Sequence, residues 1–105
     1  MATKYSQPTL VINIKRQFFA DILAIPRRKD TEYRKIGRYW ERRLENVGKP
    51  PFNLRMLNGM TPPVPEATIR VIKVFPNKKT KNYELRLGKV MSVMHWDRKK
   101  ECPTK

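Results

Sequence analysis

The chain has 105 residues, with 24 Lys and Arg against 9 Asp and Glu, giving a formal net charge of +15. This length supports one modest hydrophobic core and excludes two. No apolar run approaches the roughly 20 residues that a membrane helix needs, and the opening residues, MATKYSQP, lack the apolar stretch of a secretory signal. The sequence therefore predicts a cytoplasmic protein without a membrane partner.

One cysteine and one histidine limit the chemistry open to the chain. Cys102 has no second cysteine to pair with, which fits a reducing compartment, and one His with one Cys cannot supply a zinc site. The four glycines form no Gly-rich loop of the kind that cradles phosphate. We therefore expect no metal and no cofactor, and the sequence carries no signal for an oligomeric state.

The excess of positive charge is the strongest compositional feature. Such an excess opposes compaction by self-repulsion and is typical of proteins whose partner is a polyanion. Nucleic acid is therefore the expected partner. The alternative is that the basic residues only keep the protein in solution.

The first half of the chain predicts a strand, a helix, a second strand and a second helix. After a flexible start over residues 1–8, Thr9 to Ile14 are apolar and largely β-branched, which predicts a buried strand. The next apolar residues recur at spacings of three and four, which predicts a helix that Pro26 ends. Its core-facing stripe would be Phe18, Phe19, Ile22, Leu23 and Ile25.

Residues 30–34 form the predicted second strand, with an unusually charged face. Alternation places Asp30, Glu32 and Arg34 on one side, and Thr31 and Tyr33 on the other. Such a face is either a solvated edge or the floor of a polar groove, and the surrounding basic sequence favours the groove. Gly37 then leads into a helix that Gly48 ends, and Ile36, Trp40, Leu44 and Val47 fall on one helical face.

The second half predicts a run of strands. Residues 52–58 alternate as a third strand, the proline-rich residues 58–65 are a loop, and residues 68–75 read as a central strand covered on both faces. A basic hairpin loop over residues 76–82 leads to alternating and apolar segments up to residue 96, with a bulge or bend at Gly88. Residues 97–105 are expected to be a disordered basic tail. These elements predict an α+β fold: a small, partly open barrel of five to six strands with two short helices, in one domain over residues 9–96.

Several segments together resemble one known family, the ASCH domain. They are VINIK at residues 11–15 leading into FFADILA, then RRKDTEYR, YWERRL, LNG and YELRLGKV, and they span roughly residues 9–95. The order of the segments is more specific than any one of them, and it looks like the small ASCH proteins of bacteriophages and bacteria. The sequence departs from the family at the helix-to-strand turn, where Ile25, Pro26, Arg27 and Arg28 stand in place of the glycine of an ILxGxK pattern.

The resemblance implies a PUA-like barrel associated with RNA, with a cleft beside the first helix. By that match Lys29, Glu32 and Arg34 line the cleft, and Tyr33 and the Tyr39–Trp40 pair line or support it. Arginine and lysine suit phosphate, and a glutamate suits an exocyclic amine of a base. The residues expected to contact RNA, or another single-stranded nucleic acid, are Arg27, Arg28, Lys29, Glu32, Tyr33, Arg34, Tyr39 and Arg43.

Three alternatives remain open from the sequence. Glu32 and Arg34 could instead form a structural salt bridge, and the chain could be a basic adaptor for a protein partner. The resemblance also implies a hydrolase acting on RNA or on acetylated cytidine, in which Lys29 and Glu32 would be catalytic. The amidohydrolases of the family use lysine, threonine and glutamate, whereas here Glu32 stands at the threonine position, with Thr31 one place away.

Overall fold

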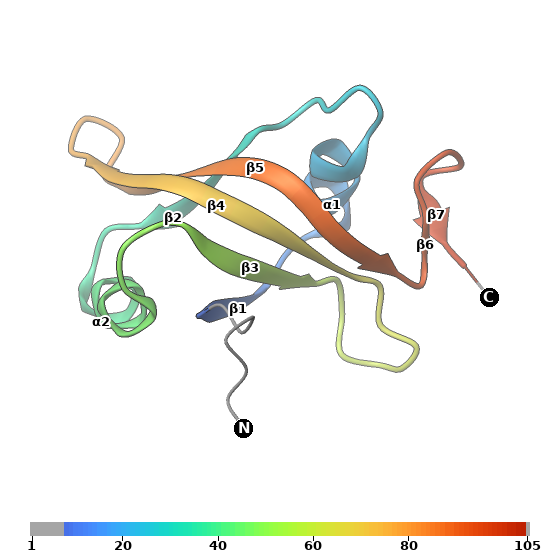
Figure 1. Cartoon of the computed structure of the whole chain (residues 1–105), viewed down its shortest axis with the longest axis horizontal. Coiled ribbons are helices and arrows are strands. Elements are labelled where there is room, and N and C mark those ends of the chain that lie inside the picture. The colour runs from blue at the N-terminus through green and yellow to red at the C-terminus, as the bar shows by residue number, and fades with distance from the viewer. Residues whose placement is uncertain (1–7, 105) are drawn as a thin grey trace.

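The computed structural model describes residues 8–104, and the predicted flexible start over residues 1–8 lies outside them except for Pro8 (Figure 1). Two helices and seven strands follow one another along the described chain. In order they are β1 (Thr9–Asn13), α1 (Arg16–Leu23), β2 (Thr31–Lys35), α2 (Arg38–Val47), β3 (Phe52–Leu57), β4 (Glu66–Asn77), β5 (Asn82–Met94), β6 (Trp96–Asp97) and β7 (Cys102–Pro103).

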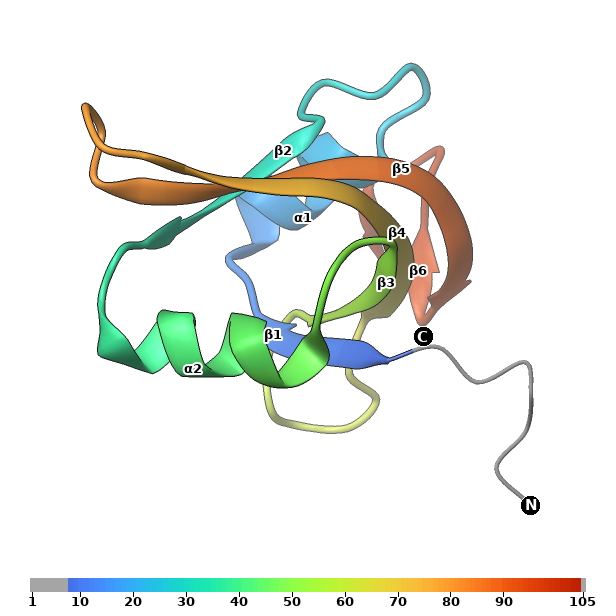
Figure 2. The same cartoon turned by 60° about the vertical axis from the view of Figure 1, so that its left-hand side comes forward.

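The first five strands form one curled sheet in the order β1-β3-β4-β5-β2. Only β1 and β3 are parallel among these neighbours, and the other pairs are antiparallel. The long strands β4 and β5 bend along their length, so that the sheet has the shape of a half-barrel (Figure 2). The predicted α+β, barrel-like architecture is confirmed at this level. Counting β6 and β7, the described residues form seven strands rather than five or six.

The core lies on the concave face of the sheet, against α1. Alternation along β3 places Phe52, Leu54 and Met56 inward as predicted, each with no exposed surface. From α1, Phe19, Ile22 and Leu23 complete this core. The predicted stripe was wrong at two positions, because the side chains of Phe18 and Ile25 are 41% and 71% exposed. Phe18 lies about 100° around the helix from Phe19, and Ile25 follows the last helical residue.

The prediction that β4 is a central strand is confirmed, but the prediction that both of its faces are buried was wrong. β4 is the middle strand of the sheet, but only one face is buried, through Ala67, Ile69 and Val71. Ile72, on the other face, is 55% exposed. The register between β4 and β5 shifts at three places, one of them opposite Gly88, where the sequence predicted a bulge.

The predicted disordered tail was also wrong. Residues 96–103 form the β6–β7 hairpin, which packs against α1 at the right of Figure 1. Buried Trp96 meets the ring of Phe19 edge-on at 5.0 Å, and Arg98 Nε donates to the Leu23 carbonyl at 2.9 Å. Two-residue strands are too short to show periodicity, so this hairpin depends on contacts distant in sequence.

Gly88 allows the close approach of β4 and β5 at their bulge. A Cβ there would lie 2.9 Å from Ile72 Cγ2. We expect Gly88→Ala to lower the free energy of unfolding by about 1–2 kcal/mol through overpacking, and Ile72→Ala to recover part of the loss in the double variant. Denaturant unfolding measures both.

The matched control is Gly37→Ala, because no atom lies within 4 Å of its added Cβ. Equal effects of the two glycine substitutions would contradict the packing explanation.

Candidate nucleic-acid interface

Arg34 connects the two edges of the curled sheet. Its Nη2 donates to Glu32 Oε2 at 2.6 Å on the same strand, and to the Asn13 carbonyl at 3.0 Å on β1. Arg43 of α2 donates to the carbonyl of Val11, also on β1. Since β1 and β2 are the outermost strands of the sheet, these bonds occupy carbonyls that no neighbouring strand would use. The two arginines therefore close the open side of the half-barrel.

Glu32 is the buried anion of this region, with 4% of its surface exposed. Besides Arg34, it has Lys29 as a partner, whose Nζ lies 3.9 Å from Glu32 Oε1. A buried carboxylate with one cation on each oxygen is compensated on both sides, whereas removal of a cation would leave charge uncompensated. The predicted salt bridge and the predicted proximity of Lys29, Glu32 and Arg34 therefore both occur.

A hollow of about 280 Å³ lies between α1 and β2 and includes Glu32 and Arg34 of this charged group in its wall. Of the residues that the sequence indicated for such a cleft, Glu32, Tyr33 and Arg34 line it, whereas Lys29, Tyr39 and Trp40 are not among its lining residues. The remaining lining residues come from the end of β1 and the start of α1: Asn13, Ile14, Lys15 and Phe18. Sequence reasoning missed them. The sequence predicts Phe18 in the core, because its spacing fits the apolar stripe as well as the spacing of Phe19 does.

Rings and cations alternate around the hollow. Lys29 Nζ lies 4.6 Å from the ring centre of Tyr33 and 5.3 Å from that of Phe18. The guanidinium of Arg34 lies 5.1 Å from the ring centre of Trp40. These distances are within the range of cation–π attraction, so each ring helps to hold a cation in place.

The same alternation continues onto α2. The guanidinium of Arg43 lies 4.8 Å from the ring centre of Trp40 and 5.6 Å from that of Tyr39. As predicted, Trp40 packs against the core, while Tyr39 is 66% exposed. Tyr39 thus presents an open ring beside a positive charge.

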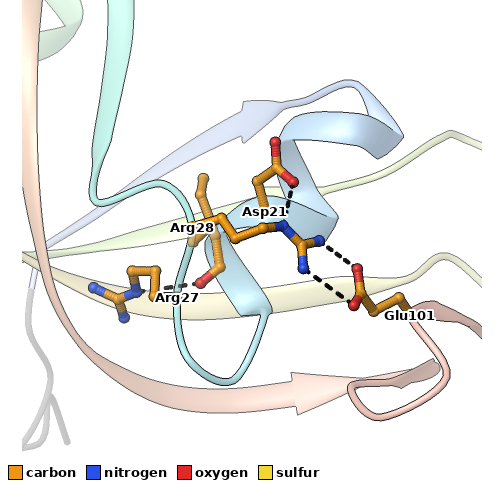
Figure 3. Close-up of polar contacts among 5 residues, drawn as sticks. Asp21, Arg27, Arg28 and Glu101 are labelled. Atoms are coloured by element: carbon orange, nitrogen blue, oxygen red, sulfur yellow. Dashed lines mark hydrogen bonds and ion pairs between the residues drawn. The ribbon is translucent and has the colours of Figure 1, made fainter.

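Arg27 and Arg28 do not join the other predicted contact residues. The guanidinium of Arg27 donates to the carbonyls of Ile22, Leu87 and Gly88, which ties the α1–β2 loop to β5. Figure 3 shows Arg28 between Asp21 of α1 and Glu101 of the β6–β7 turn, with ion pairs to both. Both arginines therefore hold parts of the fold together.

The hydrolytic set implied by the resemblance is only partly assembled. Lys29 and Glu32 are neighbours, but the hydroxyl of Thr31 donates to Asp30 Oδ1 at 3.0 Å, and Thr31 is buried. Within residues 8–104, no group of three or more His, Cys, Asp or Glu side chains is arranged to hold a metal ion. Over the same residues, neither helix is long and apolar enough to cross a membrane.

A second, larger hollow of about 430 Å³ lies between α2 and the paired ends of β4 and β5. Its lining is mostly apolar, including Leu44, Phe52 and Val74, and its charged residues are Glu41, Glu45 and Lys49. The two carboxylates outnumber the one cation and would repel a phosphate backbone. This hollow therefore does not suit a polyanion, in contrast to the hollow beside α1.

Comparison of the chain with protein-family models, with curated proteins and with solved structures found no match.

Removal of Arg34 tests its role in closing the half-barrel. We expect Arg34→Leu to lower the free energy of unfolding by about 3 kcal/mol, because Glu32 is left buried with less compensation. The double variant Glu32→Leu/Arg34→Leu should be more stable than Arg34→Leu alone. Chemical denaturation measures both differences. The control is Arg55→Leu, which breaks the more exposed Arg55–Glu66 pair and should cost less than about 1 kcal/mol. A loss as small as this in Arg34→Leu would contradict the role.

The Arg28–Glu101 pair predicts a loss of stability in acid. The hydrogen bond from Arg28 lowers the pKa of Glu101 below its ordinary value of 4.5. The stabilisation of the fold by this pair is therefore fully present above pH 4.5. It is lost as the pH falls through the lowered pKa of Glu101 in the folded state. In thermal unfolding measurements, we expect the stability difference between wild type and Glu101→Gln to shrink as the pH is lowered below 4.5. Glu45→Gln, on α2, is the control. A difference that stays constant down to strongly acidic pH would contradict the expectation.

Proposed function

We propose that this protein is an ASCH-type, PUA-like domain that binds single-stranded RNA through the hollow between α1 and β2. The observation that carries the proposal is the alternation of cations and aromatic rings around this hollow. Proteins that bind single strands combine a positive groove that follows the backbone with rings on which bases stack. The curled sheet and the position of Glu32 and Arg34 beside α1 support the link to the family that the sequence resembles.

Three rings near the hollow offer surface to a base. The exposed fraction is 41% for Phe18, 47% for Tyr33 and 66% for Tyr39, so none of the three rings is buried in the core. Phe18 and Tyr33 line the hollow itself, and Tyr39 lies beyond Arg43 on α2. Exposed rings flanked by cations suit unpaired bases, because a base has a π-face whatever its identity.

The charge around the hollow suits a phosphate backbone. Lys15 and Arg34 line the hollow, and Lys15 is exposed. Lys29 lies next to it against Glu32 and Tyr33, and Arg43 lies against Trp40 on α2. Elsewhere Asp21, Glu66 and Glu101, three of the nine Asp and Glu residues, are held in ion pairs with Arg28 and Arg55. A protein with a net charge of +15 therefore retains strong attraction for a polyanion.

Arg34 supports a ligand in this position, because it lines the hollow and its side chain is 20% exposed, which leaves part of the guanidinium open to a phosphate. Glu32, by contrast, has both of its oxygens close to cations, which favours a role in positioning Arg34 and Lys29.

The test compares two double variants that remove the same charge. Lys15→Gln/Lys29→Gln changes the hollow, and Lys99→Gln/Lys100→Gln changes the exposed β6–β7 turn. Binding of wild type to single-stranded RNA should weaken linearly on a logarithmic salt scale. The hollow variant should bind more weakly, with a salt slope smaller by about 1.4, because two phosphate contacts are lost. Fluorescence anisotropy over a salt series, with duplex RNA and single-stranded DNA in parallel, measures this.

Thermal unfolding first shows that both variants fold. Equal slopes and affinities for the hollow and turn variants, or no binding by wild type at low salt, would contradict the proposal. Cleavage of the RNA during the incubation, or release of acetate from a matched RNA that carries N4-acetylcytidine, would instead indicate the hydrolytic alternative.

A further inference from the structure

We infer that the convex face of β2, β5 and β4 is a second contact surface for the same single-stranded nucleic acid, with Tyr33 and Phe75 as its stacking rings. The inference rests on the proposed function, but it concerns residues outside the hollow. The three strands lie side by side in the sheet, as both Figure 1 and Figure 2 show.

The strand register places the two rings in one row. Tyr33 on β2 pairs with Glu84 on β5, and Glu84 pairs with Phe75 on β4. Directly paired residues project to the same face of a sheet, so the order across this face is Tyr33, Glu84, Phe75. Leu85, the residue after Glu84, points to the opposite face of the sheet and is buried in the core. The row of Tyr33, Glu84 and Phe75 therefore lies on the convex face. Two strand spacings separate the rings, which is about 10 Å.

The neighbouring rows of this face carry positive charge. Lys73 and Arg86 pair across β4 and β5, and both are exposed. On the other side of the ring row, Lys35 pairs with Asn82, and Lys35 is exposed as well. Lys73 Nζ lies 5.4 Å from the ring centre of Phe75, so a cation already lies against that ring. The face thus repeats, on the sheet, the combination of rings and cations found around the hollow.

Tyr33 makes the two surfaces continuous. Its side chain lines the hollow beside α1, and its place in the register belongs to the convex face. A nucleic acid whose base stacks on Tyr33 can therefore pass over β2, at the edge of the sheet, and continue toward Phe75. Charge complementarity favours a polyanion as the occupant of this face, since the exposed Lys35, Lys73 and Arg86 outnumber Glu84, the one carboxylate in the ring row.

The experiment varies both the protein and the length of the ligand. Phe75→Leu keeps an apolar side chain on β4 but removes the ring. We expect it to weaken binding of an unstructured RNA of about 12 nucleotides by roughly 5- to 150-fold, the range of one lost stacking contact. Binding of an RNA of about 4 nucleotides should change less, because a short strand can remain in the hollow. The same lengths of DNA show whether the 2′-hydroxyl matters.

A charge variant tests the same surface without touching a ring. Lys73→Gln/Arg86→Gln removes two exposed cations and should also weaken binding of the longer RNA, while Lys99→Gln/Lys100→Gln is the matched control. Met60→Ala, at an exposed loop position, is the control for Phe75→Leu. If Phe75→Leu unfolds, the charge variant decides the matter.

The outcomes separate this inference from the proposed function. Wild type that binds RNA, with both sheet-face variants behaving like their controls, overturns the second surface and leaves the hollow in place. Wild type that binds neither length of RNA overturns the proposed function itself.

Discussion

The arrangement of this protein depends on Arg34, held against the buried carboxylate of Glu32 and bonded to the carbonyl of Asn13. A five-stranded half-barrel has two open edges, and each presents backbone groups without strand partners. Arg34 joins the edges with a side chain, because no further strand is inserted between β1 and β2 among the described residues. Arg34 and Glu32 also line the hollow, so the contact that closes the fold shapes the surface that we propose for RNA.

The ionic side chains of the protein divide into two groups by their contacts. One group holds distant segments together: Arg27 fixes the loop before β2 to β5, and Arg28 joins α1 to the β6–β7 turn. The second group is arranged against aromatic rings around the hollow and along the convex sheet face, as Lys29 is with Tyr33 and Lys73 with Phe75. A ring, unlike a carboxylate, does not neutralise the cation that it holds, although Lys29 is also paired with Glu32. Cations held against rings therefore keep charge for the phosphates of a ligand.

Local sequence patterns predicted what depends on near neighbours. The alternation of Phe52, Leu54 and Met56 correctly gave the inward face of β3, and the charged alternation of residues 30–34 correctly placed Glu32 beside Arg34. Patterns failed where distant contacts decide. Phe18 and Phe19 both fit a helical stripe, and only the position of β2 leaves Phe18 at the hollow. The β6–β7 hairpin could not be predicted from a charged tail, since it depends on Trp96 meeting Phe19 and on Arg98 reaching Leu23.

The most direct test of the central claim is to map where RNA binds, residue by residue, with backbone amide NMR spectra of the full chain during titration with a short single-stranded RNA. The account predicts that the largest shift changes fall on Lys15 and on residues 32–34, which come from separate parts of the chain and meet only at the hollow. Changes confined to the β6–β7 turn, or spread evenly over all basic segments, would contradict it.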